Sequence, residues 1–302
     1  MTSGGTLTMV RAGLHTTVQD EGRWGHQHLG VPVGGALDLD ALRRANTLVG
    51  NVPGEAALEV TLVGCTLRAD APALVAVTGA TFDLDVDGQP ATADSVIALE
   101  AGRLLTLGQR RAGARAYVAV RGGIDSPLIL GSRSAWPLDA RRGALTDGAG
   151  LAIGSRIAGP VRRDRLPGRP RTNVLRVVAG PDAHISAGAL VVMCANTYRI
   201  TAAASRMAYP LEGARMDLLM PDRPSSGTVT GAIQVLPSGL PMLLMAERQT
   251  TGGYPVVAVV ITADLGQAAQ LAPADEVRFA LVSRADAVRA LLEQDARTRE
   301  PA

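Results

Sequence analysis

The chain has 302 residues, a formal net charge of +2 and a hydrophobic fraction of 47%. This length and apolar content suit two domains that each bury a core. The near-neutral charge gives no support to a nucleic-acid partner or an anionic membrane surface, and no apolar run approaches the ~18 residues that span a bilayer. The first residues also lack a charged segment followed by an apolar core, so we expect a soluble, cytoplasmic protein.

Alternating apolar residues and regularly spaced turn signals predict a mainly β protein. A stretch rich in Pro, Gly and Arg follows residue 159 and is typical of a linker. We therefore predict an N-terminal half over 1–160, a linker over 161–171 and a C-terminal half over 172–302. The expected strands are 58–62, 73–78, 81–86, 95–99, 103–107 and 116–120 in the first half, and 174–178, 191–194, 198–201, 231–235, 243–246, 256–261 and 277–282 in the second.

Three helices are expected. The first covers 39–48, where Asp38 can cap the N-terminus and Gly50 can end the helix. The other two cover 263–271 and 285–296. In the last helix, Val288, Leu291 and Leu292 fall on one face, which predicts that this face packs against its own domain.

A first polar run lies between His15 and Gly25, and a glycine-rich loop leads from it into the first helix. The run holds hydroxyls, an amide, carboxylates and a guanidinium. With backbone N–H groups, these can bind a carboxylate or a phosphate. The alternative is an entry loop with solvated charges, and this run alone does not decide between the two.

A second polar run, from Glu247 to Pro255, separates two apolar strands. Its Gly252-Gly253 pair fits an ordinary hairpin turn. An arginine, a glutamine and two threonines stand directly before the glycines, however. Polar donors held between buried strands are typical of binding and catalytic sites, so we favour a site here.

Other chemistry-bearing residues are few. The sequence contains no lysine, so the chain cannot carry biotin on a lysine, form a Schiff base or supply a Walker-type lysine. Cys65 and Cys194 are isolated in apolar surroundings and are expected to be small buried hydrophobes. His26 and His28 lack a third ligand, so no metal site is predicted. Ser132 lacks a paired base, which makes it a weak candidate for a nucleophile.

Several motifs stand in the order known from one protein family. They are Thr16-Thr17-Val18-Gln19-Asp20, Gly22-Arg23, Tyr117-Val118-Ala119-Val120-Arg121-Gly122-Gly123-Ile124, Ser205-Arg206-Met207, Gly231-Ala232-Ile233-Gln234 and the run from Arg248 to Pro255. On these motifs the chain resembles the allophanate hydrolase subunit 2 family, which is also known as the family of the 5-oxoprolinase C subunit or of the biotin-dependent carboxyltransferases. The resemblance extends over nearly the whole sequence.

The resemblance implies a fold of two cyclophilin-like β-barrel halves with a few short helices. It also implies one component of the multi-subunit, ATP-dependent 5-oxoprolinase, which opens the small molecule 5-oxoproline to glutamate. The expected partners are the smaller B subunit of that enzyme, which is like allophanate hydrolase subunit 1, and its A subunit. ATP with Mg²⁺ would be bound by the complex, and no biotin would be attached to this chain.

Two other functions stay open. The same architecture serves as the carboxyltransferase component of urea carboxylase, which would use biotin on a separate protein. Some family members are labelled antagonists of a sensor-kinase inhibitor, which would make the role regulatory and non-catalytic. The side chains of the two polar runs suit any small amide-like acid. The residues alone therefore do not distinguish the 5-oxoprolinase hypothesis from the carboxyltransferase hypothesis.

The expected site draws on both polar runs, which we predict to line one cleft. Asp20 is the candidate general base, and Arg248 and Gln249 are the other candidate catalytic residues. Anion contacts are expected from Arg23, Arg206 and Arg248. Substrate or nucleotide binding is expected from Thr16, Thr17, Gln19, Gln234, Thr250, Thr251, Gly252 and Gly253, with Tyr254 lining the pocket.

The sequence departs from the family pattern at three positions near these runs. Gly34 stands where the family usually has Ser, while Ala208 and Pro210 replace the usual Gly and Arg. One hydroxyl and one guanidinium are thereby lost from the candidate pockets. These changes bear on the substrate more than on the fold.

Overall fold

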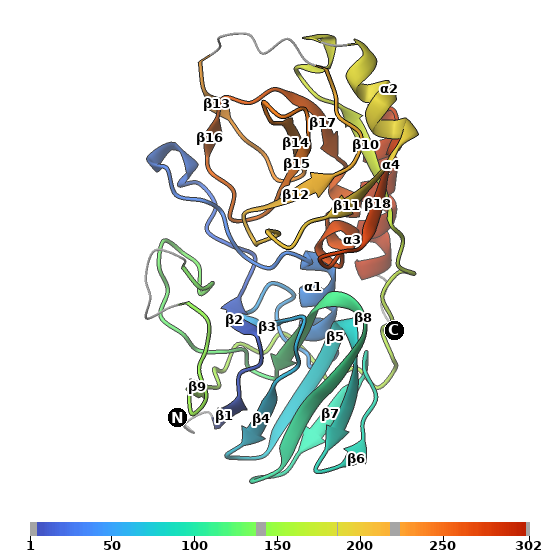
Figure 1. Ribbon diagram of the computed structural model, residues 1–302. Coiled ribbons are helices and arrows are strands. Elements are labelled where there is room, and N and C mark those ends of the chain that lie inside the picture. Colours follow the sequence, from blue (N-terminus) through green and yellow to red (C-terminus); the bar gives the residue numbers. More distant parts are fainter. Residues whose placement is uncertain (1–4, 137–142, 186, 218–223, 300–302) are drawn as a thin grey trace. The chain divides into compact units, whose positions relative to one another are not determined.

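The structure is a computed structural model that describes residues 5–136, 143–185, 187–217 and 224–299. Strands dominate the chain, which confirms the predicted mainly β class (Figure 1). The chain divides into two compact units. The first unit contains the residues up to Trp24 together with Gly34–Pro170, and the second contains Gly25–Val33 and the residues from Arg171 onward. The residues predicted as a linker therefore group with the first unit up to Pro170.

The first unit is built on a nine-stranded sheet in which β2, β3, β8, β4, β1 and β9 are neighbours in that order. The long strand β5 pairs antiparallel with β8 and also carries β6 and β7. The strands are β1 (Thr6–Arg11), β2 (His15–Gln19), β3 (Ala57–Thr61), β4 (Thr66–Ala69), β5 (Ala73–Val86), β6 (Gln89–Pro90), β7 (Val96–Leu99), β8 (Leu104–Val120) and β9 (Gly150–Ala152).

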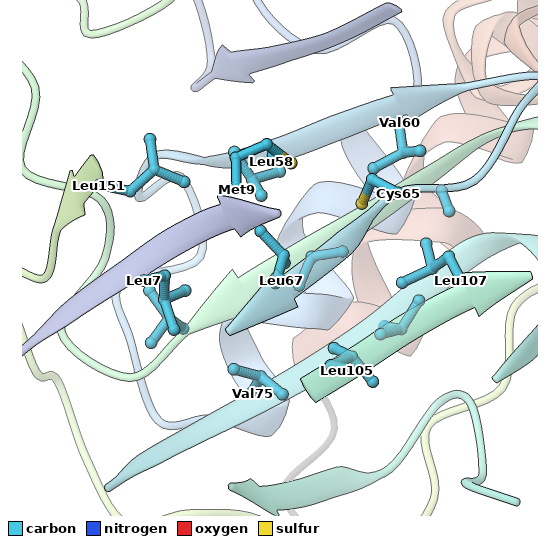
Figure 2. Close-up of a cluster of buried hydrophobic side chains, with 14 of the residues drawn as sticks. Leu7, Met9, Leu58, Val60, Cys65, Leu67, Val75, Leu105, Leu107 and Leu151 are labelled. Carbon is cyan, nitrogen blue, oxygen red and sulfur yellow. The ribbon is translucent and has the colours of Figure 1, made fainter. Parts of the chain in front are cut away.

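A large core cluster of the first unit lies on one face of this sheet. Figure 2 shows Met9, Leu58, Leu67 and Leu105 gathered between their strands, and all four side chains are buried. Cys65 belongs to the same cluster, which confirms its expected role as a small buried hydrophobe. Burial raises the pKa of its thiol to about 12. Burying each large aliphatic side chain contributes about 1.5–3 kcal/mol to folding.

The helix α1 (Leu39–Leu48) covers the other face of the sheet and contacts β5 and β8. As predicted, the Asp38 carboxylate caps it by accepting a hydrogen bond from the Ala41 backbone N–H at 3.0 Å. Gly50, with φ of +76°, follows its C-terminal end as expected for a residue that stops a helix. Ala41, Leu42 and Ala45 point into the interface with the sheet.

The second unit is a closed seven-stranded barrel with the order β10-β17-β14-β15-β12-β11-β18. A parallel pairing of β10 with β18 closes it, while the other neighbours are antiparallel. A small ribbon of β13 and β16 stands apart. The strands are β10 (Val174–Ala179), β11 (Thr197–Ile200), β12 (Ala208–Glu212), β13 (Ser226–Gly227), β14 (Ala232–Val235), β15 (Pro241–Leu244), β16 (Thr251–Gly252), β17 (Val256–Val260) and β18 (Glu276–Leu281).

The short helices of the second unit are η1 (Gln27–Leu29), η3 (Ala183–Ile185), η4 (Thr262–Asp264) and α3 (Leu265–Ala269), and the longer ones are α2 (Ala187–Ala195) and α4 (Arg284–Arg299). The prediction of a strand over 191–194 was wrong, because this apolar stretch lies in α2. An apolar run without alternation does not distinguish a buried strand from a helix. In the described part of the chain, no helix is long and apolar enough to cross a membrane.

The face of α4 that packs differs in part from the prediction, because Leu291 is half-buried as expected but the other two predicted residues are not. Ala290 is 5% exposed and joins a small core cluster with Ala287 beside it. Val288 and Leu292 are instead 57% and 63% exposed.

Candidate functional site

Asp20 stands directly after β2 and holds a cluster of donors around its carboxylate. Its Oδ1 accepts hydrogen bonds from Ser132 Oγ at 2.6 Å, Ser134 Oγ at 2.5 Å and the Gly22 N–H at 2.8 Å. Its Oδ2 accepts one from the Arg133 N–H at 2.6 Å. Asp20 is only 9% exposed. We call these five residues the Asp20 cluster.

This arrangement favours a positioning role for Asp20. A general base needs a lone pair directed at the proton that it removes, whereas four donors already occupy this carboxylate. The cluster fixes segment 132–134 against the end of β2, and the Asp20 N–H in turn donates to Ser134 Oγ at 2.9 Å. The sequence indicated Ser132 only as a weak candidate for a nucleophile and gave no role to Ser134.

Arg23 is buried in the same unit. It is 2% exposed and donates to the Ser134 carbonyl at 2.6 Å. Its guanidinium lies 5.2 Å from the centre of the Trp136 ring, which is a cation–π distance. Gly34 has φ of +64°, and a Cβ there would lie 3.2 Å from Arg23 Nη1. A serine at position 34 would therefore be strained in this loop.

The remaining predicted residues of the first run are also buried. Thr16 is fully buried and donates to the Ala12 carbonyl at 2.6 Å. Gln19 is fully buried, and its Nε2 donates to Thr17 Oγ1 at 3.0 Å. Its Oε1 has no partner among the described residues. Thr16, Thr17 and Gln19 therefore belong to the interior of the first unit.

A cavity of ≈ 720 Å³ lies beside the Asp20 cluster in the first unit. Val18, Arg133, Ser134 and Leu145 are among the residues that line it. Arg133 forms an ion pair with Asp125 at 2.8 Å, so the charge of this lining arginine is compensated. Apolar and polar residues are mixed among the described lining residues, and the charges of Arg133 and Asp125 compensate each other.

The second polar run forms a structured loop in the second unit, running from the end of β15 to β17. Within it, the two-residue strand β16 pairs with β13. Thr228, which follows β13, donates from its backbone N–H to the Thr250 carbonyl at 3.0 Å and from Oγ1 to the Gln249 carbonyl. Side-chain and backbone hydrogen bonds thus hold the loop in one conformation. We call residues 245–255 the hairpin loop.

Arg248 is a buried cation at the base of the hairpin loop. Only 5% of it is exposed. Its Nη1 donates to Thr230 Oγ1 at 2.8 Å, its Nη2 donates to the Thr228 carbonyl at 3.2 Å, and its Nε has no partner among the described residues. Both partners are neutral, and burial lowers the pKa of Arg248. A buried charge that is not paired is costly, so this side chain is suited to receive an anion.

Arg206 is placed differently from Arg248. Its Nε donates to Glu247 Oε1 at 2.6 Å, and both side chains are largely buried. The Glu247 N–H also donates to the Arg206 carbonyl at 3.0 Å. The ion pair compensates the charge of Arg206, which makes it a weaker candidate for an anion contact than the sequence indicated.

The outer part of the hairpin loop is more open. Gln249, Thr251 and Gly253 are exposed, Thr250 and Gly252 are half-buried, and Tyr254 is 41% exposed. Beneath them, Gln234 on β14 is 4% exposed. A Cβ on Gly252 would lie 2.8 Å from Gln234 Nε2, so a larger residue there would have to displace this amide. The prediction that both polar runs line one cleft stays a prediction.

The Asp20 cluster and the hairpin loop do not fit ATP with Mg²⁺. Magnesium takes oxygen ligands, usually carboxylates and phosphates, but the oxygens of Asp20 are occupied by protein donors. Across the described residues there is no group of three or more His, Cys, Asp or Glu that could hold a metal ion. Among the described residues, the hairpin loop offers Arg248 as a single uncompensated cation, which does not match a polyphosphate.

Comparisons with known proteins give consistent matches. The carboxyltransferase domain family, described as subdomain A and B, matches residues 29–281. The chain is 35% identical over 297 residues to the C subunit of 5-oxoprolinase from Escherichia coli, covering 95% of both chains. It is similar to the crystal structure of TTHA0988, with a TM-score of 0.83 and 31% identity over 92% of this chain and 56% of that one. The Kluyveromyces lactis urea carboxylase structure gives a TM-score of 0.91 at 26% identity, over 99% of this chain and 29% of that one.

Proposed function

We propose that this chain, which belongs to the carboxyltransferase domain family with subdomains A and B, is a subunit of a 5-oxoprolinase that converts 5-oxoproline to glutamate. The match carrying this proposal is 35% identity across 95% of both this chain and the E. coli protein. Family membership also confirms the resemblance seen in the sequence motifs.

The reaction breaks the lactam C–N bond of 5-oxoproline and adds water, with coupled ATP hydrolysis. Because neither the Asp20 cluster nor the hairpin loop fits a magnesium nucleotide, we assign ATP binding to another part of the complex. The proposed partners are the smaller B subunit and the A subunit of the same enzyme. The E. coli relative is named as one lettered subunit of its enzyme, which supports an assembly of several chains.

Within this chain, the proposed site is the hairpin loop, with Arg248 as the group that meets an anion. Gln249, Thr250 and Thr251 present amide and hydroxyl groups beside it, and Tyr254 lines the opening. Such preorganised donors can stabilise charge in a transition state by about 3–4 kcal/mol per donor. In the first unit, Asp20 positions segment 132–134.

The experiment that tests the proposal is co-expression of this chain with the A and B subunits. Glutamate formed from 5-oxoproline is measured with ATP, without ATP, and with each of the three chains omitted in turn. We expect glutamate only when ATP and all three chains are present. Glutamate formation without ATP, or none with the full set of chains, would contradict the proposal.

A second function is favoured by one observation, the TM-score of 0.91 to urea carboxylase across 99% of this chain. A carboxyltransferase role needs a carboxylated biotin. The chain contains no lysine that could carry biotin, so the carrier would be a separate protein. An avidin blot of the co-purified partners, followed by a carboxyl-transfer assay, distinguishes this role from lactam hydrolysis.

A further inference from the structure

Arg248 and its neighbours give the hairpin loop one net positive charge. Arg206 and Glu247 compensate each other through their 2.6 Å contact. Arg248 is 5% exposed, and no carboxylate among the described residues pairs with it. Its two protein acceptors are a threonine hydroxyl and a backbone carbonyl, neither of which carries a formal charge.

We infer that Arg248 receives the carboxylate of a small, singly charged organic acid, the group that 5-oxoproline and glutamate share. The identity of the acid rests on the proposed function, whereas the kind of ligand rests on the geometry of the loop. Arg248 is thereby the residue that selects for an acid over a neutral lactam or amide.

The geometry supports a carboxylate because the protein fixes the Arg248 guanidinium but uses only part of its hydrogen-bonding capacity. A guanidinium has five N–H donors in a planar fork, and the contacts to Thr230 and Thr228 use two of them. These contacts fix the plane of the fork before a ligand binds. A carboxylate can then accept two parallel hydrogen bonds from one edge of the guanidinium.

Charge balance argues against a nucleotide at the same place. A triphosphate usually binds with Mg²⁺ and several cations or backbone N–H donors. The hairpin loop supplies one uncompensated arginine, and its carboxylate, Glu247, is already paired with Arg206. A ligand with one negative charge therefore matches this site, and a ligand with three or four does not.

The test measures binding to the purified full-length chain by titration calorimetry. The ligands are 5-oxoproline, its neutral amide, and ATP with Mg²⁺. The variant is Arg248→Gln, and Arg199→Gln on β11 is the matched control, because Arg199 is an exposed arginine of the same barrel. Melting temperatures of all chains are recorded, and Arg248→Lys, which keeps the charge but loses the fork, serves as a second variant if Arg248→Gln does not fold.

We expect the wild type and Arg199→Gln to bind 5-oxoproline at least ~10-fold more tightly than its amide, as a charge-assisted pair requires. Arg248→Gln should lose that preference by weakening binding of the acid while leaving binding of the amide unchanged. The inference is overturned if Arg248→Gln keeps the preference, if the wild type binds no acid at ~10 mM, or if the variant weakens ATP binding more than acid binding.

Failure of this inference and failure of the proposed function give different results. If Arg248→Gln loses the acid preference but the assembled complex makes no glutamate, the carboxylate site stands and the 5-oxoprolinase assignment falls. If the complex makes glutamate and the acid preference survives in Arg248→Gln, the assignment stands and the carboxylate lies elsewhere.

Discussion

At the level of single residues, burial gives Asp20 and Arg248 opposite roles. Four donors surround the Asp20 carboxylate, whereas the acceptors of Arg248 among the described residues are neutral. A buried charge with a full set of hydrogen bonds stabilises the fold around it, and one without a counter-charge remains available to a ligand. Asp20 is therefore expected to affect stability, and Arg248 to affect binding.

Replacing Asp20 by Asn should destabilise the first unit. One oxygen becomes an NH₂ group that faces donors, so hydrogen bonds are lost and a polar group is left buried without a partner. We expect the free energy of unfolding to fall by about 2–4 kcal/mol, as measured by urea denaturation. The control is Asp70→Asn, because Asp70 lies at the surface with Thr8 and Arg68. A stable Asp20→Asn protein that lacks all activity would instead indicate a chemical role.

Cys65 should resist alkylation in the folded protein. Burial raises the pKa of its thiol to about 12, and the thiolate is the reactive species. At pH 8 only ~1 in 10⁴ molecules would carry the thiolate, and the side chain is 0% exposed. We expect iodoacetamide to label Cys65 in urea but not in buffer, as read by mass spectrometry of tryptic peptides. Equal labelling rates in both conditions would show that this core opens readily.

At the level of elements, a buried polar tie connects the start of α1 to the sheet of the first unit. Tyr117 on β8 donates to Glu59 Oε2 at 2.6 Å and accepts from the Asp38 N–H at 2.8 Å. The Leu37 N–H also donates to Glu59 Oε2, at 2.9 Å. Strands β3 and β8 thereby fix the position of the N-terminus of α1. These hydrogen bonds add to the apolar contacts between the helix and the sheet.

Tyr117→Phe should loosen this tie and change the response to alkaline pH. Removing the hydroxyl takes away the acceptor of the Asp38 N–H and one donor to Glu59, which costs about 1–3 kcal/mol at neutral pH. Burial raises the pKa of Tyr117 well above its usual value, so the folded state keeps the proton that an unfolded tyrosine loses near pH ~10. Stability from this group is present below pH ~10 and is lost as the pH rises further. Urea denaturation from pH 7 to 11 should show a shallower alkaline loss in the variant, and an unchanged slope would contradict this account.

The elements show what a sequence can and cannot predict. The helix at 39–48 was confirmed because its cap and its stop are both local signals. The strands predicted at 73–78 and 81–86 are one strand, β5, because register shifts around Gly79 bend the strand without ending it. Strand β2 went unpredicted because its polar residues face the interior, where pairing with β3 and tertiary contacts decide the structure.

The candidate site was predictable only where it depends on local sequence signals. The sequence indicated the hairpin loop because its polar residues interrupt two apolar strands. It could not rank Arg206 against Arg248, because the ranking depends on the pairing of Arg206 with Glu247 in space. The donors Ser132 and Ser134 lie 112 and 114 residues from Asp20 along the chain, so only the folded structure brings them together.

At the level of the whole molecule, the two units are not consecutive in the chain. Gly25–Val33 groups with the second unit although it lies within the sequence of the first. We expect a fragment that starts at Arg171 to unfold at a lower urea concentration than the same fragment carrying 25–33 through a flexible N-terminal linker, because the short segment supplies part of the unit. Circular dichroism of both fragments checks this, and equal midpoints would show that the segment is dispensable.

The parallel pairing of β10 with β18 leaves the strands of the second barrel without a free backbone edge. Unpaired edges are where extended chains from other molecules add on and seed insoluble assemblies. The hydrogen-bonded path of the first unit ends instead at β2 and β9, although β9 has only three residues. When the protein is stressed by heat or overproduction, self-association through backbone pairing should therefore begin at the open sheet, while the barrel resists it until its seam separates.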